Sequence, residues 1–242
     1  PTQARVRPDG ISHVISTDEV VPGDVLLLEA RDSVAADGRL GVAVGLEIDE
    51  SALTGESQPA GKQSAQLAAL NAPLGDRINM VFKGTAVAQG TGRAVVTGVG
   101  MDSEVGAIAE MLDALDADGV RWGIVTNKPE YLAKLLMPIL GWSERCGVLV
   151  GGDSLPERKP HPLPLLHSAD VIGIAAQDCV YVGDDERDIV AARAAGMPSI
   201  AALWGYRLPG VDPLDWRGDV MIEWPRTLLD PAVWPTKVAM PL

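Results

Sequence analysis

The sequence has little of what would place it in a membrane, on nucleic acid or in an oxidising compartment. No apolar run approaches the ~20 residues that a membrane helix needs, so we expect no membrane insertion by this chain. Its 20 Lys and Arg are outnumbered by 33 Asp and Glu, and the net charge of −13 argues against binding to nucleic acid or anionic lipid. The only cysteines, Cys146 and Cys179, lie in apolar runs, which predicts buried thiols rather than a disulfide or a metal site. We therefore expect a cytoplasmic chain, and the start at Pro1 without methionine suggests a processed or excised piece.

The two halves of the chain differ in their secondary-structure pattern. Residues 1–105 contain short alternating runs separated by Gly, Pro and Asp, which is typical of an all-β domain. Between residues 120 and 230, apolar strands alternate with helices, which predicts a doubly wound parallel sheet with its site at the carboxyl ends of the strands. A helix over 103–117 is expected to join the halves. The chain is long enough for two ordinary domains, and we place them at 1–111 and 112–242.

The pattern also predicts the individual elements of the second half. Apolar runs bounded by turn residues indicate strands over 123–126, 147–150, 180–182, 200–203 and 220–222. The segments between them indicate helices over 129–140, 162–170 and 188–195. In the first half, residues 58–78 are rich in Ala, Gln and Gly and are expected to form an exposed loop.

Five blocks in the first half occur in an order that resembles the actuator domain of P-type cation-transporting ATPases. They are VPGDV at 21–25, VAADGRL at 34–40, EIDESALTGES at 47–57, NMVFKGT at 79–85 and GVGMDSEVG at 98–106. In that family the Thr-Gly-Glu-Ser loop moves onto a phosphorylated aspartate, and its glutamate positions the attacking water. The resemblance assigns this role to Glu56, and a carboxylate suits it because it can orient water and accept its proton. A plain polar turn at 54–57 is the alternative interpretation.

Three blocks in the second half resemble haloacid-dehalogenase-type phosphatases, particularly the phosphoglycolate and N-acetylmuramic acid 6-phosphate phosphatases. They are VRWGIVTNKP at 120–129, RKPHP at 158–162 and VYVGDDERD at 180–188, and they match the second, third and fourth motifs of that family. The likeness continues to about residue 234. It implies a Mg²⁺-dependent phosphomonoester hydrolase whose ligand is a small phosphorylated molecule.

The resemblance assigns roles to individual residues, and phosphoryl transfer explains each of them. Thr126 and Asn127 would hold a phosphoryl oxygen, and Lys159 would neutralise the phosphate, because the spread negative charge must be clamped. Asp184 would bind Mg²⁺ directly, and Asp188 would act on the metal through another ligand or through a bound water. The other acids of the fourth motif are expected to cap the following helix. His161, which lies between two prolines, is interpreted as a loop residue without a catalytic role.

The aspartate that such phosphatases use as nucleophile is missing. The family opens with a strand that carries Asp-x-Asp-Gly, and actuator-like sequence occupies that part of this chain. Asp116-Ala117-Asp118-Gly119 has the right letters but follows apolar residues at helical spacing, and the segment before Thr126 is too short for a crossover between parallel strands. We interpret Asp116 as part of a helix end with Gly119 as its cap.

The missing segment has a structural consequence. In the family it forms the central strand, between the strands that end at Thr126 and Asp184. Another segment fills the slot, the two strands close up, or this half folds poorly, since unpaired buried backbone groups cost about 1–3 kcal/mol each.

The resulting expectation is a composite chain in which a phosphatase core lacks its nucleophile and has little or no turnover. The alternative is a non-catalytic phosphate-binding or regulatory module. A third possibility is an ATPase actuator fragment in an artificial fusion.

Overall fold

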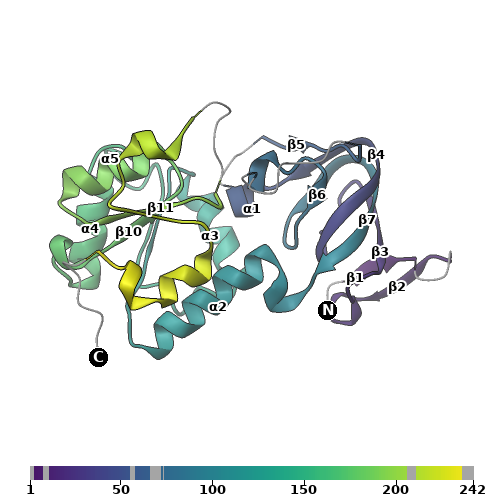
Figure 1. The fold of residues 1–242 in the computed structure, drawn as a ribbon, viewed down its shortest axis with the longest axis horizontal. Coiled ribbons are helices and arrows are strands. Elements are labelled where there is room, and N and C mark those ends of the chain that lie inside the picture. The colour runs from purple at the N-terminus through teal and green to yellow at the C-terminus, as the bar shows by residue number, and fades with distance from the viewer. Residues whose placement is uncertain are drawn as a thin grey trace. The chain divides into compact units, whose positions relative to one another are not determined.

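The structure, a computed structural model, describes residues 3–7, 11–54, 58–65, 72, 74–205 and 211–235. It divides into two compact units, residues 1–110 and 111–242. As expected, the first is built on an antiparallel sheet and the second on parallel strands with helices between them (Figure 1). Among the described residues, no helix has the length and apolarity to cross a bilayer.

A seven-stranded sheet forms the first unit. The strands are β1 (Gln3–Val6), β2 (His13–Ser16), β3 (Val25–Glu29), β4 (Asp37–Asp49), β5 (Ala60–Gly61), β6 (Met80–Val81) and β7 (Ala86–Gly98). Their order is β2-β1-β3-β7-β4-β5, and β6 pairs with β4. A short helix, α1 (Ser51–Thr54), follows β4.

The long strands β4 and β7 show why this half folds as a sheet. Along β7, Ala94 and Val96 are buried and Val95 between them is exposed, as period-two patterning requires. The register shifts by bulges, and at one of them Gly90 has φ +78°, where an added Cβ would lie 2.1 Å from the Gly45 carbonyl oxygen. Only glycine fits this crossing of two backbones.

Helix α2 (Glu104–Ala117) begins on a buried carboxylate of the first unit. Asp37 Oδ1 accepts a hydrogen bond from the Lys83 amide (2.7 Å), and Asp37 Oδ2 accepts one from the Glu104 amide (2.8 Å). The second contact places negative charge at the positive end of α2. Burial nevertheless raises the pKa of Asp37 to about 6, against these two hydrogen bonds.

The second unit alternates strands and helices as predicted. It contains β8 (Ile124–Val125), α3 (Glu130–Ile139), β9 (Leu149–Val150), α4 (Leu163–Ile172), β10 (Tyr181–Gly183), α5 (Glu186–Ala195), β11 (Ser199–Ala202) and β12 (Val220–Ile222). The strands form two separate parallel sheets, β8-β9 and β10-β11-β12. The doubly wound sheet is therefore partial, and β8 and β10 belong to separate sheets with no backbone pairing between them in the described residues.

Two expectations were wrong in part. Residues 58–78 are not simply an exposed loop: β5 pairs with β4, and Lys62 directly after it is 5% exposed. Cys146 and Cys179 are free thiols as expected, but both are half-buried and neither lies in a strand. The Cys146 thiol donates to the Val148 carbonyl (3.0 Å).

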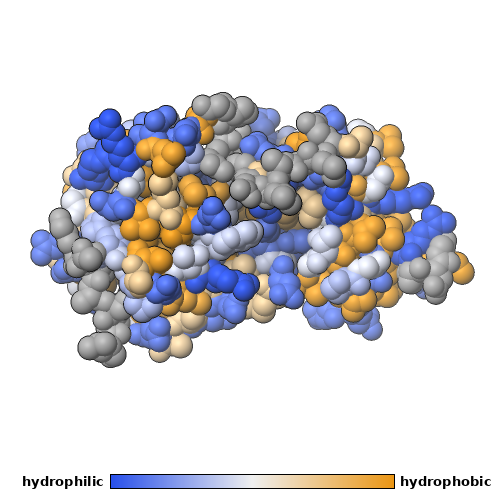
Figure 2. All heavy atoms as spheres, in the orientation of Figure 1, coloured by the Kyte–Doolittle hydropathy of each residue, from blue (hydrophilic) through white to orange (hydrophobic). Residues whose placement is uncertain are grey.

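On the molecular face in Figure 2, hydrophobic side chains form patches among hydrophilic ones. The sheet of the first unit also carries large exposed apolar residues, of which Val44 is 64% exposed.

Candidate functional site

The second motif follows β8, whose last residue is Val125. The Thr126 amide donates to the Val150 carbonyl of β9 (2.9 Å), which fixes the backbone at the carboxyl end of the strand. The Thr126 hydroxyl accepts a hydrogen bond from the Lys128 amide (3.1 Å), a local turn that holds the side chain in place.

Asn127 links the second motif to the third. Its Nδ2 donates to the Lys159 carbonyl (2.9 Å), and its buried Oδ1 has no hydrogen-bond partner among the residues that the structure describes. The backbone here is crowded, since an added Cβ at Gly152 would lie 2.2 Å from the Asn127 carbonyl oxygen. The Asn127 amide group therefore holds the Lys159 loop in position, and it has one unsatisfied acceptor.

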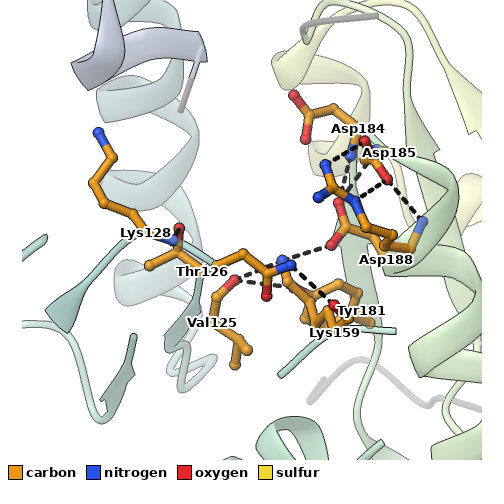
Figure 3. A network of polar contacts seen from close by, with 10 residues as sticks. Val125, Thr126, Lys128, Lys159, Tyr181, Asp184, Asp185 and Asp188 are labelled. Atoms are coloured by element: carbon orange, nitrogen blue, oxygen red, sulfur yellow. Dashed lines mark hydrogen bonds and ion pairs between the residues drawn. The ribbon is translucent and has the colours of Figure 1, made fainter. Parts of the chain in front are cut away.

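Lys159 lies at the centre of the site and is 9% exposed. Its ammonium forms an ion pair with Asp188 Oδ1 (2.5 Å) and donates to the Tyr181 hydroxyl (2.9 Å) and the Val125 carbonyl (2.9 Å). Figure 3 shows Lys159 and Tyr181 between Val125 on one side and the acidic residues on the other. Because an ammonium has three N–H groups, these three acceptors account for its whole donor capacity.

Sequence reasoning missed Tyr181, which was treated only as part of an apolar strand. Its hydroxyl accepts from Lys159 and donates to the Val125 carbonyl (3.1 Å). Burial raises the pKa of Tyr181 above its ordinary value, so the phenol is neutral at pH 7. A tyrosine in an otherwise apolar strand was the only available signal, since a partly buried phenol needs a hydrogen-bond partner.

The same contacts keep Lys159 charged. Burial disfavours its ammonium, but the Tyr181 oxygen and the Asp188 carboxylate outweigh burial, and the pKa of Lys159 is raised. Since Tyr181 is neutral, we attribute the raised pKa mainly to Asp188. The site therefore holds a permanent buried cation at neutral pH.

The fourth motif divides its acids between two tasks. Asp185 is the N-cap of α5 as expected, and Asp188 completes a capping box. Asp188 Oδ2 accepts from the amides of Asp184 (3.1 Å) and Asp185 (3.2 Å), so this carboxylate binds backbone on one oxygen and Lys159 on the other. Gly183 leaves room for it, since a Cβ there would lie 2.2 Å from the Asp188 Cβ.

Asp184 projects differently from Asp188. Its side chain lies directly on Gly205, where an added Cβ would be 2.1 Å from Asp184 Oδ2. In Figure 3 the Asp184 carboxylate points away from Asp188 and Lys159. Gly205 thus provides the space that this carboxylate occupies.

The described residues do not form a complete metal site. No group of three His, Cys, Asp or Glu side chains that could hold a metal occurs within the described ranges. Asp188 has its oxygens engaged, so the residues present fit Mg²⁺ only through Asp184 together with ligands from a phosphate, water or another segment. Such a sparse set is chemically reasonable for Mg²⁺, which keeps several waters.

Two aspartates of the matched segments make local structural contacts. Asp116 is in the last turn of α2, where Oδ1 accepts from Trp122 Nε1 (2.7 Å) and Oδ2 from Arg145 Nε (2.6 Å). The helix-end interpretation is confirmed, and Gly119 beyond it has φ +72°. Asp49 Oδ1 accepts from the Ser51 amide (3.0 Å) before α1, whereas Glu56 lies outside the described residues.

An ion pair joins two described residues that precede and follow Glu56 in the sequence. Glu50 and Lys62 meet at 2.6 Å with side chains that are 3% and 0% exposed. Burial raises the pKa of Glu50 and lowers that of Lys62, against the attraction between them. The chain before and after Glu56 is therefore tied together by two buried charges.

Comparisons with known proteins divide the chain in the same way as its motifs. Residues 1–113 match the family described as the P-type ATPase actuator domain, and residues 102–202 match the haloacid dehalogenase-like hydrolases. The two halves resemble two different families. The composite nature of the chain is thereby confirmed.

Three of the similar proteins are phosphatases by their names. A phosphoglycolate phosphatase of Xanthomonas campestris is 69% identical over 125 residues, which are 52% of this chain and 57% of that protein. An N-acetylmuramic acid 6-phosphate phosphatase of Pseudomonas aeruginosa is 42% identical over 51% of this chain and 54% of that protein. The crystal structure of a predicted phosphoglycolate phosphatase from Haemophilus somnus is 30% identical, with a TM-score of 0.48 over 50% of this chain and 53% of that one. The chain spans about half the length of the curated relatives it matches.

Proposed function

We propose that residues 111–242 carry the phosphate-binding part of a Mg²⁺-dependent phosphomonoester hydrolase that acts on phosphoglycolate or a sugar phosphate. The observation that carries this proposal is the buried, permanently charged Lys159 at the carboxyl end of β8, directly beside the Thr126 backbone. The phosphatases of Xanthomonas campestris and Pseudomonas aeruginosa support the substrate class.

Each residue has a task in this chemistry. The Thr126 hydroxyl donates to a phosphoryl oxygen, and Lys159 balances the charge that spreads over the phosphate. Asp184 would hold Mg²⁺, which supplies charge neutralisation at the phosphate when it is bound. Asp188 positions Lys159 and closes α5 rather than contacting the substrate.

We further propose that this chain alone has no turnover. Within the described ranges, Asp188 is the one carboxylate on Lys159, and its contacts with Lys159 and two backbone amides leave it unsuited to attack phosphorus. The Lys159 ammonium has no remaining N–H for a phosphate unless it gives up one of its present partners. The same contacts disfavour the alternative of a tight phosphate-binding module.

A hybrid enzyme tests the proposed function. Residues 119–235 would be joined to the part of the Xanthomonas campestris phosphatase that this chain does not match. We expect Mg²⁺-dependent hydrolysis of phosphoglycolate that falls at least about 100-fold in Lys159→Met and Asp184→Asn, because each removes transition-state charge stabilisation. Lys134→Met, on the exposed surface of α3, is the matched control and should retain full activity.

Three results would count against the proposal. Hybrids that fold but do not hydrolyse phosphoglycolate, a sugar phosphate or an aryl phosphate would remove the hydrolase assignment. Turnover by the purified chain itself that depends on both Mg²⁺ and Lys159 would refute the inactivity. Strong stabilisation by phosphate without hydrolysis would favour the binding module.

A further inference from the structure

The loop that follows β9 is the basis of this inference. Strands β8 and β9 pair in parallel, so their carboxyl ends lie side by side. The turn over residues 126–130 follows β8 and carries Thr126 and Asn127 of the candidate site. Residues 151–154, Gly-Gly-Asp-Ser, follow β9, and we call them the support loop. None of the three phosphatase-like motifs includes this loop.

Hydrogen bonds join the support loop to the turn. The Gly152 amide donates to the Lys128 carbonyl (2.8 Å), which continues the pairing of β8 and β9 beyond the ends of the strands. Asp153 Oδ1 accepts a hydrogen bond from the Glu130 amide (2.7 Å), at the point where the turn enters α3. The turn is therefore attached to the support loop at two points.

Asp153 supplies a cap that α3 does not obtain from the residue before it. That residue is Pro129, whose side chain makes no capping hydrogen bond. The exposed Asp153 carboxylate accepts the hydrogen bond of the first amide of α3 and places negative charge at the positive end of the helix. The position of the first turn of α3 therefore depends on a side chain of the support loop.

Two glycines allow the support loop to approach the turn this closely. An added Cβ at Gly151 would lie 2.5 Å from the Glu130 amide nitrogen, and one at Gly152 would lie 2.2 Å from the Asn127 carbonyl oxygen. Both atoms belong to the backbone, which cannot rotate away as the end of a side chain can. Neither glycine has a positive φ, so the need for space and not the backbone conformation requires glycine at these positions.

The turn in its place holds Lys159. Asn127 Nδ2 donates to the Lys159 carbonyl (2.9 Å), and the Thr126 hydroxyl lies in the same turn, where it accepts from the next amide but one (3.1 Å). A shift of the turn would therefore move the hydroxyl and the backbone of the buried lysine together.

We infer that the support loop is a positioning element for the candidate site. Gly152 fixes the backbone of Asn127, Asp153 fixes the start of α3, and Asn127 in turn holds the segment that carries Lys159. The loop acts through Asn127 and the turn. This arrangement does not depend on the proposed function, whereas its effect on hydrolysis rests on that function.

Two substitutions in the full chain test the arrangement by nuclear magnetic resonance. Gly152→Ala places a methyl group against the Asn127 carbonyl, and Asp153→Ala removes the cap from an exposed position, so the second variant should fold even if the first does not. In both we expect the Asn127 side-chain amide protons to exchange at least about tenfold faster, because the contact with the Lys159 carbonyl opens. Asp153→Asn keeps an acceptor oxygen, and its exchange should stay within about twofold of the wild type.

Gly123→Ala separates positioning from general destabilisation. Gly123 directly precedes β8, where an added Cβ would lie 2.4 Å from Val148 Cγ1 and 2.9 Å from the Val148 carbonyl oxygen. The variant therefore crowds the same pair of strands at the end that is far from the turn. It should lower the urea midpoint of the second unit, measured by tryptophan fluorescence, and leave the exchange of the Asn127 side chain unchanged.

The hybrid phosphatase extends the test to catalysis. Gly152→Ala and Asp153→Ala should lower kcat at least about tenfold, because a small displacement of a charged group weakens its hold on the transition state. KM should change less than about threefold, since the loop acts through the turn and not on the substrate. Asp153→Asn should restore kcat, and Gly123→Ala should retain it.

Three results would overturn the inference. They are unchanged Asn127 exchange in both alanine variants of the loop, equally faster exchange in Gly123→Ala, and a raised KM at constant kcat, which would make the loop a direct substrate contact. Faster Asn127 exchange together with hybrids that hydrolyse nothing would support the inference and count against the proposed function alone.

Discussion

Replacement of Lys159 by methionine should destabilise the second unit far more than an ordinary surface change. Methionine keeps most of the apolar length of the side chain, so the variant removes charge and hydrogen bonds with little loss of packing. It leaves Asp188, which is 4% exposed, without its cation. The Val125 carbonyl keeps its bond to Tyr181.

The expected loss is about 3 kcal/mol in the free energy of unfolding. Removing one partner of a buried ion pair typically costs 3–5 kcal/mol, and the lower end applies because Asp188 retains two backbone donors. With a urea dependence of about 2 kcal/mol per molar, the midpoint falls by about 1.5 M. Lys134→Met breaks an exposed pair with Glu130 and should cost at most about 0.5 kcal/mol.

The tryptophans allow this measurement within the intact chain. All six lie between residues 122 and 234, so their fluorescence reports unfolding of the second unit and not of the first. The double variant Lys159→Met/Asp188→Asn should recover part of the loss, because it no longer buries an uncompensated charge. A midpoint for Lys159→Met within 0.3 M of the wild type would refute the reasoning, as would an equal loss in Lys134→Met.

Three further predictions concern other buried groups. Burial raises the pKa of Asp37 from 3.8 to about 6, so the folded state binds a proton more tightly than the unfolded state does. The free energy of unfolding of the first unit should therefore fall by about 3 kcal/mol as the pH rises from about 4 to 6. Urea titrations followed by amide signals of β4 and β7 should show this fall, and a fall of the same size in Asp37→Asn would contradict it. By the same method, Lys62→Met should lower the free energy of unfolding by about 3 kcal/mol. Adding Glu50→Leu should restore most of this loss, because no buried charge is then left without its partner. A loss below about 1 kcal/mol in Lys62→Met would count against a buried ion pair. In the hybrid phosphatase, Gly205→Ala should lower kcat/KM at least about tenfold by displacing Asp184. Gly218→Ala is the control and should not lower it, because the nearest atom to an added Cβ there is the Ala201 Cβ at 3.4 Å. Equal activities of the two variants would exclude this role for Gly205.

Local sequence signals were sufficient to predict α2 and the strands and helices of the second unit. The expected helix over 103–117 is observed as α2, and the expected strand over 180–182 is observed as β10. Asp185 caps α5 because a short acceptor side chain before a helix satisfies its first amides, a rule that needs no tertiary information. The same kind of reasoning excluded Asp116 as a nucleophile, since helical spacing is visible in the sequence.

The contacts that define the site could not be derived in this way. Tyr181, Lys159 and Val125 are separated by 22 to 56 residues, and their convergence depends on how β8 and β10 face each other. The buried pair of Glu50 and Lys62 was missed for a related reason, because composition alone made residues 58–78 resemble a loop. Long side chains that satisfy distant backbone groups leave no periodic trace in a sequence.

The place where the two families meet also has a physical explanation. The family matches overlap over residues 102–113, and nearly all of this overlap lies in α2. The helix starts on Asp37 of the first unit and ends with Asp116 bound to Arg145 of the second. An α-helix satisfies its backbone hydrogen bonds internally except at its ends, so each end needs only its own local partners. A continuous helix can therefore run from one half into the other with only local partners at each end. A strand shared by the two halves could not do this, because its hydrogen-bond partners would have to come from the sheets of both halves.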